Sequence, residues 1–264
     1  MASKYEDDPE MEGSIVTSET VPRGFVVSTG SFPKSEFVSQ AKGRNYTLDL
    51  GVKPAEEGFH RPQDSLLVTS NIINGEEVTV IGVADGVSNS FPSVPYAFSG
   101  ENSKMFLSGF NRIIHERFIS RQSITESTWL NKQIDDLRDS IWSKMGNTTL
   151  QFYVVRRKPN GAKTVTSFMI GNENDLGVNQ LSINSIFAPG RDFRSNSDRL
   201  SFALADNVYP IVTEYPLEPN QTVTIATSTD GIGDKDGLLT SKSLPQILRE
   251  ATRDDLVCAV LTVS

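Results

Sequence analysis

Aspartates stand at the ends of apolar, strand-like runs in four places of the sequence. Asp64 precedes one such run, Asp85 directly follows another, and the stretch TIATSTDGIGDKDG places Asp230 directly after a third. The fourth place is the pair Asp254-Asp255, just before the last apolar run. Carboxylates that meet at one rim in a low-dielectric pocket repel each other, and cations relieve that repulsion. Ligation by oxygen alone favours hard ions, so the pattern predicts Mg²⁺ or Mn²⁺ in preference to zinc or copper.

Each aspartate also has a simpler interpretation. Asp-Gly is a common turn dipeptide, and an aspartate beside a strand often hydrogen-bonds the backbone of a loop. A β-rich binding protein with incidental turns would leave these aspartates far apart in space. An EF-hand calcium loop starting at Asp230 is excluded, because Ile232 occupies its third position and Lys235 stands where glycine is needed.

The predicted elements that carry these residues are strands that come before and after a helical region in the sequence. β-branched residues flank the turn Asn74-Gly75, which is typical of a hairpin. Apolar residues then recur at helical spacing over 102–118, with Asn102 or Ser103 available as N-cap, and over 127–145, with Gly146 as the stop. Further strands are predicted over 148–155, 164–171, 179–187, 200–205, 222–228 and 256–263, with a third helix from Ser243 before the last of them. Strands grouped apart from paired helices favour an α+β domain with packed sheets over alternating βαβ units.

Composition and charge exclude several classes of function. The 264 residues carry a formal net charge of −8, which argues against a general nucleic-acid binder or a protein that binds anionic membranes. The apolar runs are too short to span a membrane, and the acidic N-terminus lacks the features of a secretory signal. Cys258 is the only cysteine, cannot form an internal disulfide, and is interpreted as a small buried hydrophobe. A cytoplasmic location is therefore expected. The first 20 or so residues are polar and without periodicity, and are predicted to be a mobile extension.

Five short motifs together point to a known family. HRPQDS, VADGVSNS, GNTTL, TSTDGIGD and RDDLVCAVLTV occur in the order found in metal-dependent protein phosphatases of the type 2C kind, and the chain resembles their bacterial-like members. The resemblance covers residues 46–264 and leaves 1–45 as an N-terminal extension. It implies a four-layer sandwich in which two packed antiparallel β-sheets are flanked by antiparallel helix pairs.

The resemblance also implies residue roles. Asp85 would bridge two Mg²⁺ or Mn²⁺ ions, and the carbonyl of Gly86 would hold one of them. Asp230 and Asp254 would ligate the other ion, and Asp64 would act mainly through metal-bound water. Two such ions can share a water, lower its pKa and present it as hydroxide, while they neutralise charge on the phosphate.

Other positions extend the resemblance or depart from it. Asp234 resembles a ligand of a third, weaker ion, but Asn172 stands where the family often has an aspartate, which weakens the case for that ion. Gln63 stands where the family often has a glutamate, which removes one negative charge near the expected metal ions. The family has a cationic group near Asp64 to bind the phosphoryl group, and either Arg61 or His60 could serve.

The expected function is Mg²⁺/Mn²⁺-dependent hydrolysis of phosphoserine and phosphothreonine on proteins by a metal-activated water. The expected partners are phosphorylated protein substrates, with a Ser/Thr kinase or its targets as counterparts, and a monomer is expected. The departures at Gln63, at Asn172 and in the loop after Asp85 keep an alternative open. In that alternative the same fold serves as a catalytically degenerate regulatory or interaction module.

Overall fold

A computed structural model describes most of the chain, with gaps. The described residues are 25–27, 36–42, 45–56, 63–87, 96–141, 146–171, 177–184, 186–192, 200–201, 208–232 and 243–264. The segment 1–20, predicted to be mobile, lies outside them.

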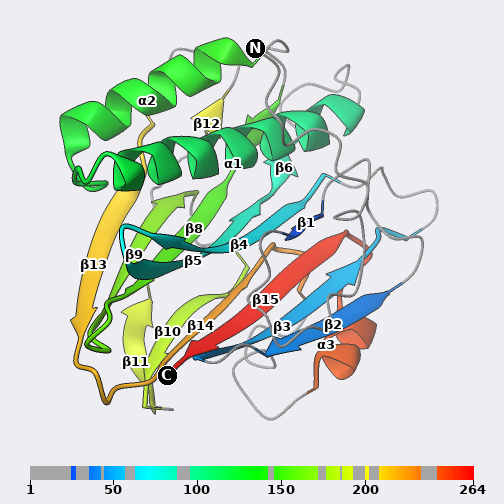
Figure 1. Ribbon diagram of the computed structural model, residues 1–264. Helices are drawn as coiled ribbons and strands as arrows, with labels where there is room; N and C mark the ends of the chain where they lie inside the picture. Colours follow the sequence, from blue (N-terminus) through cyan, green and yellow to red (C-terminus); the bar gives the residue numbers. More distant parts are fainter. Residues whose placement is uncertain are drawn as a thin grey trace.

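Two six-stranded sheets, antiparallel throughout, form the centre of the fold (Figure 1). The first sheet consists, in spatial order, of β1 (Phe25–Val27), β4 (Ser65–Ile73), β5 (Glu76–Ala84), β8 (Leu150–Arg157), β9 (Lys163–Ile170) and β13 (Ile211–Leu217). The second consists of β11 (Ile186–Asp192), β10 (Asn179–Ile183), β14 (Val223–Ser228), β15 (Leu256–Val263), β3 (Tyr46–Lys53) and β2 (Phe37–Lys42). A small third sheet joins β12 (Leu200–Ser201), β7 (Asn147–Thr148) and β6 (Gly86–Val87).

Helices cover the outer faces of both large sheets. The hairpin of α1 (Tyr96–Ile119) and α2 (Ser127–Ser140) lies over the first sheet, and α3 (Leu244–Glu250) packs against the second (Figure 1). The α+β sandwich with two packed antiparallel sheets is thus confirmed. Within the described residues its outer layer on the second sheet is α3 alone. None of the described helices is long and apolar enough to cross a membrane.

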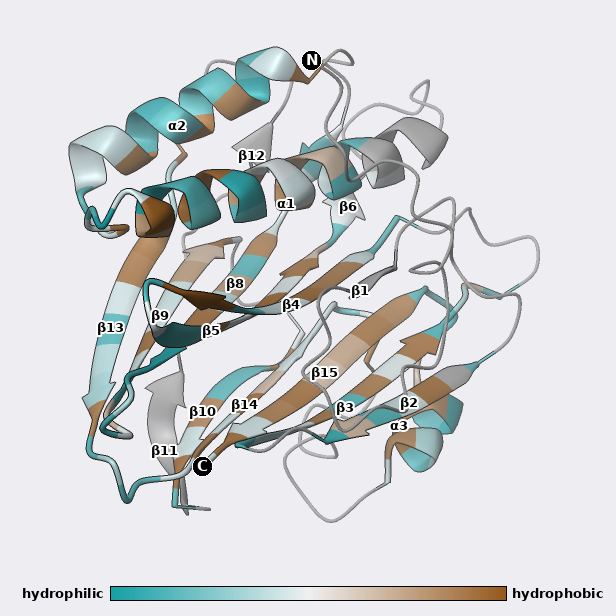
Figure 2. Ribbon diagram, viewed as in Figure 1, coloured by the Kyte–Doolittle hydropathy of each residue, from teal (hydrophilic) through white to brown (hydrophobic). Residues whose placement is uncertain are grey.

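Alternating side chains on the strands fill two separate cores. On β5, Ile81 and Val83 point into the space between the sheets, whereas Val78, Val80 and Ala84 pack beneath the helices. Both faces of this strand are therefore apolar. Figure 2 shows that hydrophobic residues dominate the strands at the centre of the fold. Each fully buried aliphatic side chain of this kind stabilises the fold by about 1.5–3 kcal/mol.

The turn predicted at Asn74-Gly75 is confirmed. Both residues have positive φ, 53° and 85°, which is the conformation of a type I′ hairpin turn. The Asn74 side chain also donates a hydrogen bond of 2.7 Å from Nδ2 to the carbonyl oxygen of Phe118, near the end of α1. The β4–β5 hairpin is therefore attached to the helix that covers it.

The helix boundaries correct two predictions. Helix α1 begins at Tyr96, so neither Asn102 nor Ser103 is its N-cap; the Ser103 hydroxyl is buried and lies in a hydrogen bond with Thr148 Oγ1 at 3.1 Å. Helix α2 ends at Ser140, because Ile141 already has extended backbone. The start predicted for α3 is confirmed, and its N-cap Ser243 takes part in a capping box.

The sheets begin before residue 46. β1 pairs with β4 at one edge of the first sheet, and β2 pairs with β3 at one edge of the second. Short segments of the region assigned to an N-terminal extension thus complete both sheets.

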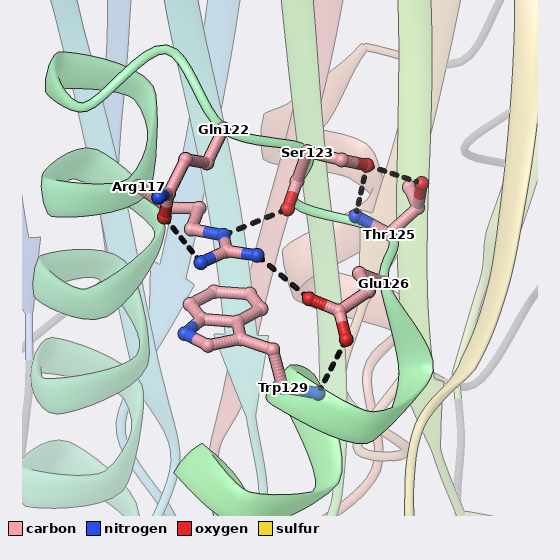
Figure 3. A network of polar contacts seen from close by, with 6 residues as sticks. All are labelled: Arg117, Gln122, Ser123, Thr125, Glu126 and Trp129. Atoms are coloured by element: carbon pink, nitrogen blue, oxygen red, sulfur yellow. Dashed lines mark hydrogen bonds and ion pairs between the residues drawn. The ribbon is translucent and has the colours of Figure 1, made fainter.

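Polar contacts fix the connection between α1 and α2 (Figure 3). Arg117 pairs with Glu126 at 2.8 Å, donates to the carbonyl of Ser123 at 2.9 Å, and lies 4.4 Å above the ring of Trp129. Glu126 in turn caps α2, because its Oε1 accepts a hydrogen bond from the Trp129 backbone N–H. These contacts set the angle at which α2 returns along α1.

Candidate functional site

Strand pairing brings the predicted aspartates to one end of the sandwich. In the first sheet Ser65 pairs with Ala84, so the neighbouring residues Asp64 and Asp85 lie at the same end of the paired strands β4 and β5. In the second sheet Ser228 pairs with Cys258, which places the end of β14 beside the start of β15.

The alternation of side chains places four polar residues in line with the core between the sheets. Residues two apart on a strand point to the same side. Each of the four continues the core-facing set of its strand, and they are Asp64 before β4, Asp85 after β5, Thr229 after β14 and Asp255 before β15. Asp64, Thr229 and Asp255 are 2%, 1% and 1% exposed. The apolar core therefore ends in a buried polar layer.

Thr229 connects the two sheets at this end. Its hydroxyl accepts a hydrogen bond from the backbone N–H of Val257 at 3.1 Å and donates one to Oδ2 of Asp64 at 2.5 Å. A second link lies deeper, where Gln151 of β8 donates to the carbonyl of Ser228 at 2.7 Å and accepts from Thr227 at 2.8 Å.

Asp255 organises the backbone around Asp64. Its Oδ2 accepts hydrogen bonds from the backbone N–H groups of Gln63 at 2.8 Å and Asp64 at 2.9 Å. Its own N–H donates to Oδ1 of the half-buried Asp254 at 2.9 Å. The start of β4 in the first sheet is thereby joined to the start of β15 in the second.

Gly231 allows the turn after Asp230 to approach this segment. A Cβ atom at Gly231 would overlap the backbone carbonyl of Asp255. The Gly231 carbonyl accepts hydrogen bonds from the backbone N–H of Thr252 at 2.9 Å and from its hydroxyl at 3.1 Å. The turn that carries Asp230 and the turn that carries Asp254 are therefore docked together.

Two threonines fix the backbone of Asp85. Its N–H donates to Thr149 Oγ1 at 3.1 Å, and its carbonyl accepts from the Thr149 N–H at 2.9 Å and from Thr148 Oγ1 at 3.1 Å. Gly86 pairs with Thr148 in the small sheet. The motifs around Asp85 and around Thr148 meet in space as a result.

Electrostatics show that the aspartates share one environment. Burial raises the pKa of Asp64 well above its usual value, and the charges of Asp255, Asp85 and Asp230 raise it further, while the hydrogen bond from Thr229 opposes the rise. Burial likewise raises the pKa of Asp255 to about 7. The aspartates do not lie on separate surfaces, as incidental turns would require.

The donor set suits a hard divalent cation. Carboxylates of Asp85, Asp230 and Asp254 and the carbonyl of Gly86 offer oxygen atoms only, and the mutual repulsion at Asp64 is the kind that a cation relieves. In the part of the chain that the structure describes, no three His, Cys, Asp or Glu side chains are close enough together to hold one ion. A site with fewer than three such side chains per ion is compatible with Mg²⁺, because Mg²⁺ keeps several water ligands and takes only one or two carboxylates.

The structure thus places most of the predicted site residues. Asp64 and Asp85 lie at the same end of the first sheet, Asp230 is close enough for its charge to raise the pKa of Asp64, and Asp254 accepts a hydrogen bond from the Asp255 N–H. The predicted residues His60, Arg61 and Asp234, like Asn172, lie outside the described residues.

Sequence reasoning gave Thr229 no role in the site, and it counted Asp255 among the strand-end aspartates without giving it a role of its own. The alternation of apolar residues along β14 and β15 was the signal that could have assigned both to the side that faces the core.

Comparison with known proteins gives distant matches only. No protein-family model matches the sequence, and no curated protein matches it. Among solved structures, the chain is similar to a serine/threonine phosphatase of S. agalactiae (14% identity, 83% of this chain and 100% of that chain, TM-score 0.49). It is also similar to a protein of the bacterial stressosome (15%, 81% and 98%, 0.48). A third is the catalytic domain of the serine/threonine protein phosphatase PstP in complex with two manganese ions (11%, 83% and 99%, 0.47).

Proposed function

We propose that this protein is a Mg²⁺- or Mn²⁺-dependent phosphatase that hydrolyses phosphoserine and phosphothreonine in proteins. One observation carries the proposal: Asp64 is buried where the two sheets meet, its backbone N–H bonds the carboxylate of Asp255, and the pairing of Ser65 with Ala84 places Asp85 at the same end of the first sheet. Such a concentration of buried negative charge is costly unless bound cations or protons neutralise it.

The chain's own residues would hold the cations and the substrate. Asp85, the Gly86 carbonyl, Asp230 and Asp254 would hold two ions, which when bound supply an activated water and neutralise charge on the phosphate. Asp64 would accept hydrogen bonds from the water ligands of these ions. The hydrogen bond from Thr229 to Oδ2 would hold its carboxylate in the orientation needed for this.

Arg61 or His60 supplies the cationic group for the phosphate in this proposal. Both precede Asp64 by only a few residues, and Asp255 anchors the backbone at Gln63. A guanidinium can bind two phosphate oxygens at once, which favours Arg61 on chemical grounds.

A cysteine nucleophile does not fit this chain. Cys258 is fully buried, its Sγ donates a weak hydrogen bond to the Gly51 carbonyl, and burial raises its pKa to about 12. At neutral pH the reactive thiolate would not form. A water nucleophile requires no such side chain.

Metal-stimulated hydrolysis of a phosphothreonine peptide tests the proposal. We expect activity with Mn²⁺ that EDTA abolishes, and a loss of at least about 100-fold in Asp85→Asn, because electrostatic stabilisation at the reacting phosphate is lost. Asp139→Asn, an exposed aspartate on α2, is the matched control and should keep full activity. An inactive wild type in Mn²⁺, or an Asp85→Asn variant as active as the control, would show that the protein is not this enzyme.

A second candidate is a catalytically degenerate module with the same fold. It is favoured by the fact that the described residues contain no group of three side chains ready to bind one ion. Calorimetric titration with Mn²⁺ separates the two candidates. A phosphatase should bind the ion with a stoichiometry that Asp85→Asn lowers, whereas a degenerate module should show no binding above that of the variant.

A further inference from the structure

Two residues outside the predicted ligand set make the contacts that fix Asp64. Thr229 donates to the Asp64 carboxylate, and Asp255 accepts from the backbone N–H groups of Gln63 and Asp64. We infer that Thr229 and Asp255, here called the inter-sheet clasp, are positioning residues for Asp64 in the proposed reaction. The inference rests on the phosphatase function proposed above.

The contacts of Thr229 leave its hydroxyl no freedom. The Val257 N–H can only donate, so the single hydroxyl proton has two acceptors in reach: Asp64 Oδ2 at 2.5 Å and the Val257 carbonyl at 3.5 Å. The much shorter contact assigns the proton to Asp64. The Asp64 carboxylate is therefore oriented by a group held on the opposite sheet. Serine could make the same two bonds, whereas valine has nearly the same shape and can make neither.

Asp255 acts on the backbone instead of the side chain. Because one oxygen, Oδ2, accepts both N–H groups, it sets the direction in which the chain enters β4 and thus where the Asp64 side chain begins. Asparagine retains a carbonyl oxygen that can accept both bonds, but alanine does not. The clasp consequently offers one rescuing and one disabling substitution at each of its two positions.

The position of the clasp argues that its role extends beyond stability. Both residues are buried at the end of the sandwich where Asp85 and Asp230 also lie, and they join the sheet that carries Asp64 to the sheet that carries Asp230. A similar hydroxyl contact occurs on the same strand away from the site, where Thr224 bonds Thr262 at 2.9 Å. That pair provides a matched control for the loss of one hydroxyl from β14.

The experiment compares kcat, KM and thermal stability in Mn²⁺ for Thr229→Val, Thr229→Ser and Thr224→Val, with rates normalised to the folded fraction. We expect Thr229→Val to lower kcat by about 10- to 100-fold with little change in KM, because a displaced catalytic group has effects of that size. Thr229→Ser should restore most of kcat, and Thr224→Val should match the wild type. A purely structural role would lower the melting temperature of both valine variants and leave kcat per folded molecule unchanged.

Hydrogen exchange at the amides of Gln63 and Asp64 provides a readout that does not depend on activity. Asp255→Ala should make these two amides exchange faster than in the wild type, and Asp255→Asn should restore their protection and the activity. An active wild type whose Thr229→Val variant keeps full kcat would overturn the inference and leave the phosphatase proposal intact. A wild type without metal-stimulated activity would overturn both, so the wild-type measurement separates the two failures.

Discussion

At the scale of single residues, Cys258 shows how packing removes a reactive group from chemistry. Its side chain lies on β15 beneath α3, so close to Gly51 that a Cβ at that glycine would lie 2.7 Å from Sγ. With a pKa raised to about 12, the thiol stays protonated in the folded state at neutral pH.

We therefore predict that Cys258 reacts with a disulfide reagent such as DTNB only when the protein unfolds. The labelling rate at neutral pH should be limited by opening of the fold, and urea should increase it by orders of magnitude. The absorbance of the released thiolate measures this directly. Rapid stoichiometric labelling in native buffer would contradict the prediction and would reopen a thiol mechanism.

The candidate site itself shows which residues a sequence can reveal. The positions of Asp64, Asp85 and Asp230 at the ends of strands could be predicted, because a carboxylate at the end of an apolar run is a local pattern. The role of Asp255 could not be predicted in that way, because its partner Asp64 lies 191 residues earlier in the chain and only the pairing of the sheets brings them together. The need for glycine at position 231 has the same origin, since the obstructing carbonyl belongs to Asp255.

At the scale of elements, the amphipathic pattern predicted α1 but not its first residue. Ser103 has the chemistry of an N-cap, yet its hydroxyl is hydrogen-bonded to the hydroxyl of Thr148, which also contacts the Asp85 carbonyl. A side chain used in tertiary contact looks the same in the sequence as one that caps a helix. The same helix therefore contributes both to the core and to the support of the candidate site.

Phe110 is the centre of the contact between α1 and the first sheet. It is fully buried, and its ring meets Phe152 edge-on at 4.8 Å and Phe168 at 5.3 Å between ring centres. We predict that Phe110→Ala lowers the free energy of unfolding by about 3–5 kcal/mol, because the cavity between helix and sheet cannot close fully.

Urea denaturation measures this change, and Ile119→Ala on the same helix is its control. Ile119 is 64% exposed, so its truncation should change stability by less than about 0.5 kcal/mol. Equal losses in the two variants would mean that α1 does not pack on the sheet through Phe110.

At the scale of the whole molecule, the sandwich buries several groups that ionise only at high pH. Burial raises the pKa of Tyr46 to about 12, assisted by the charge of Glu77, and it also raises the pKa of Tyr153 and of Cys258. Two of the three, Tyr46 and Tyr153, belong to the core between the sheets, so the cohesion of the two sheets is linked to pH.

We predict that this linkage makes the fold lose stability in alkali. A group whose pKa is raised by folding favours the folded state while it stays protonated. The stability due to Tyr46 is therefore complete below its unfolded pKa of 10.0 and is lost as the pH rises towards about 12.

In the described part of the chain the buried Tyr46 hydroxyl has no hydrogen-bond partner, so replacing Tyr46 by phenylalanine should cost little stability at neutral pH. Urea unfolding at pH steps between about 8 and 11 should give a shallower decline for Tyr46→Phe than for the wild type. Parallel declines for the two proteins would show that Tyr46 ionises as freely in the folded chain as in the unfolded one.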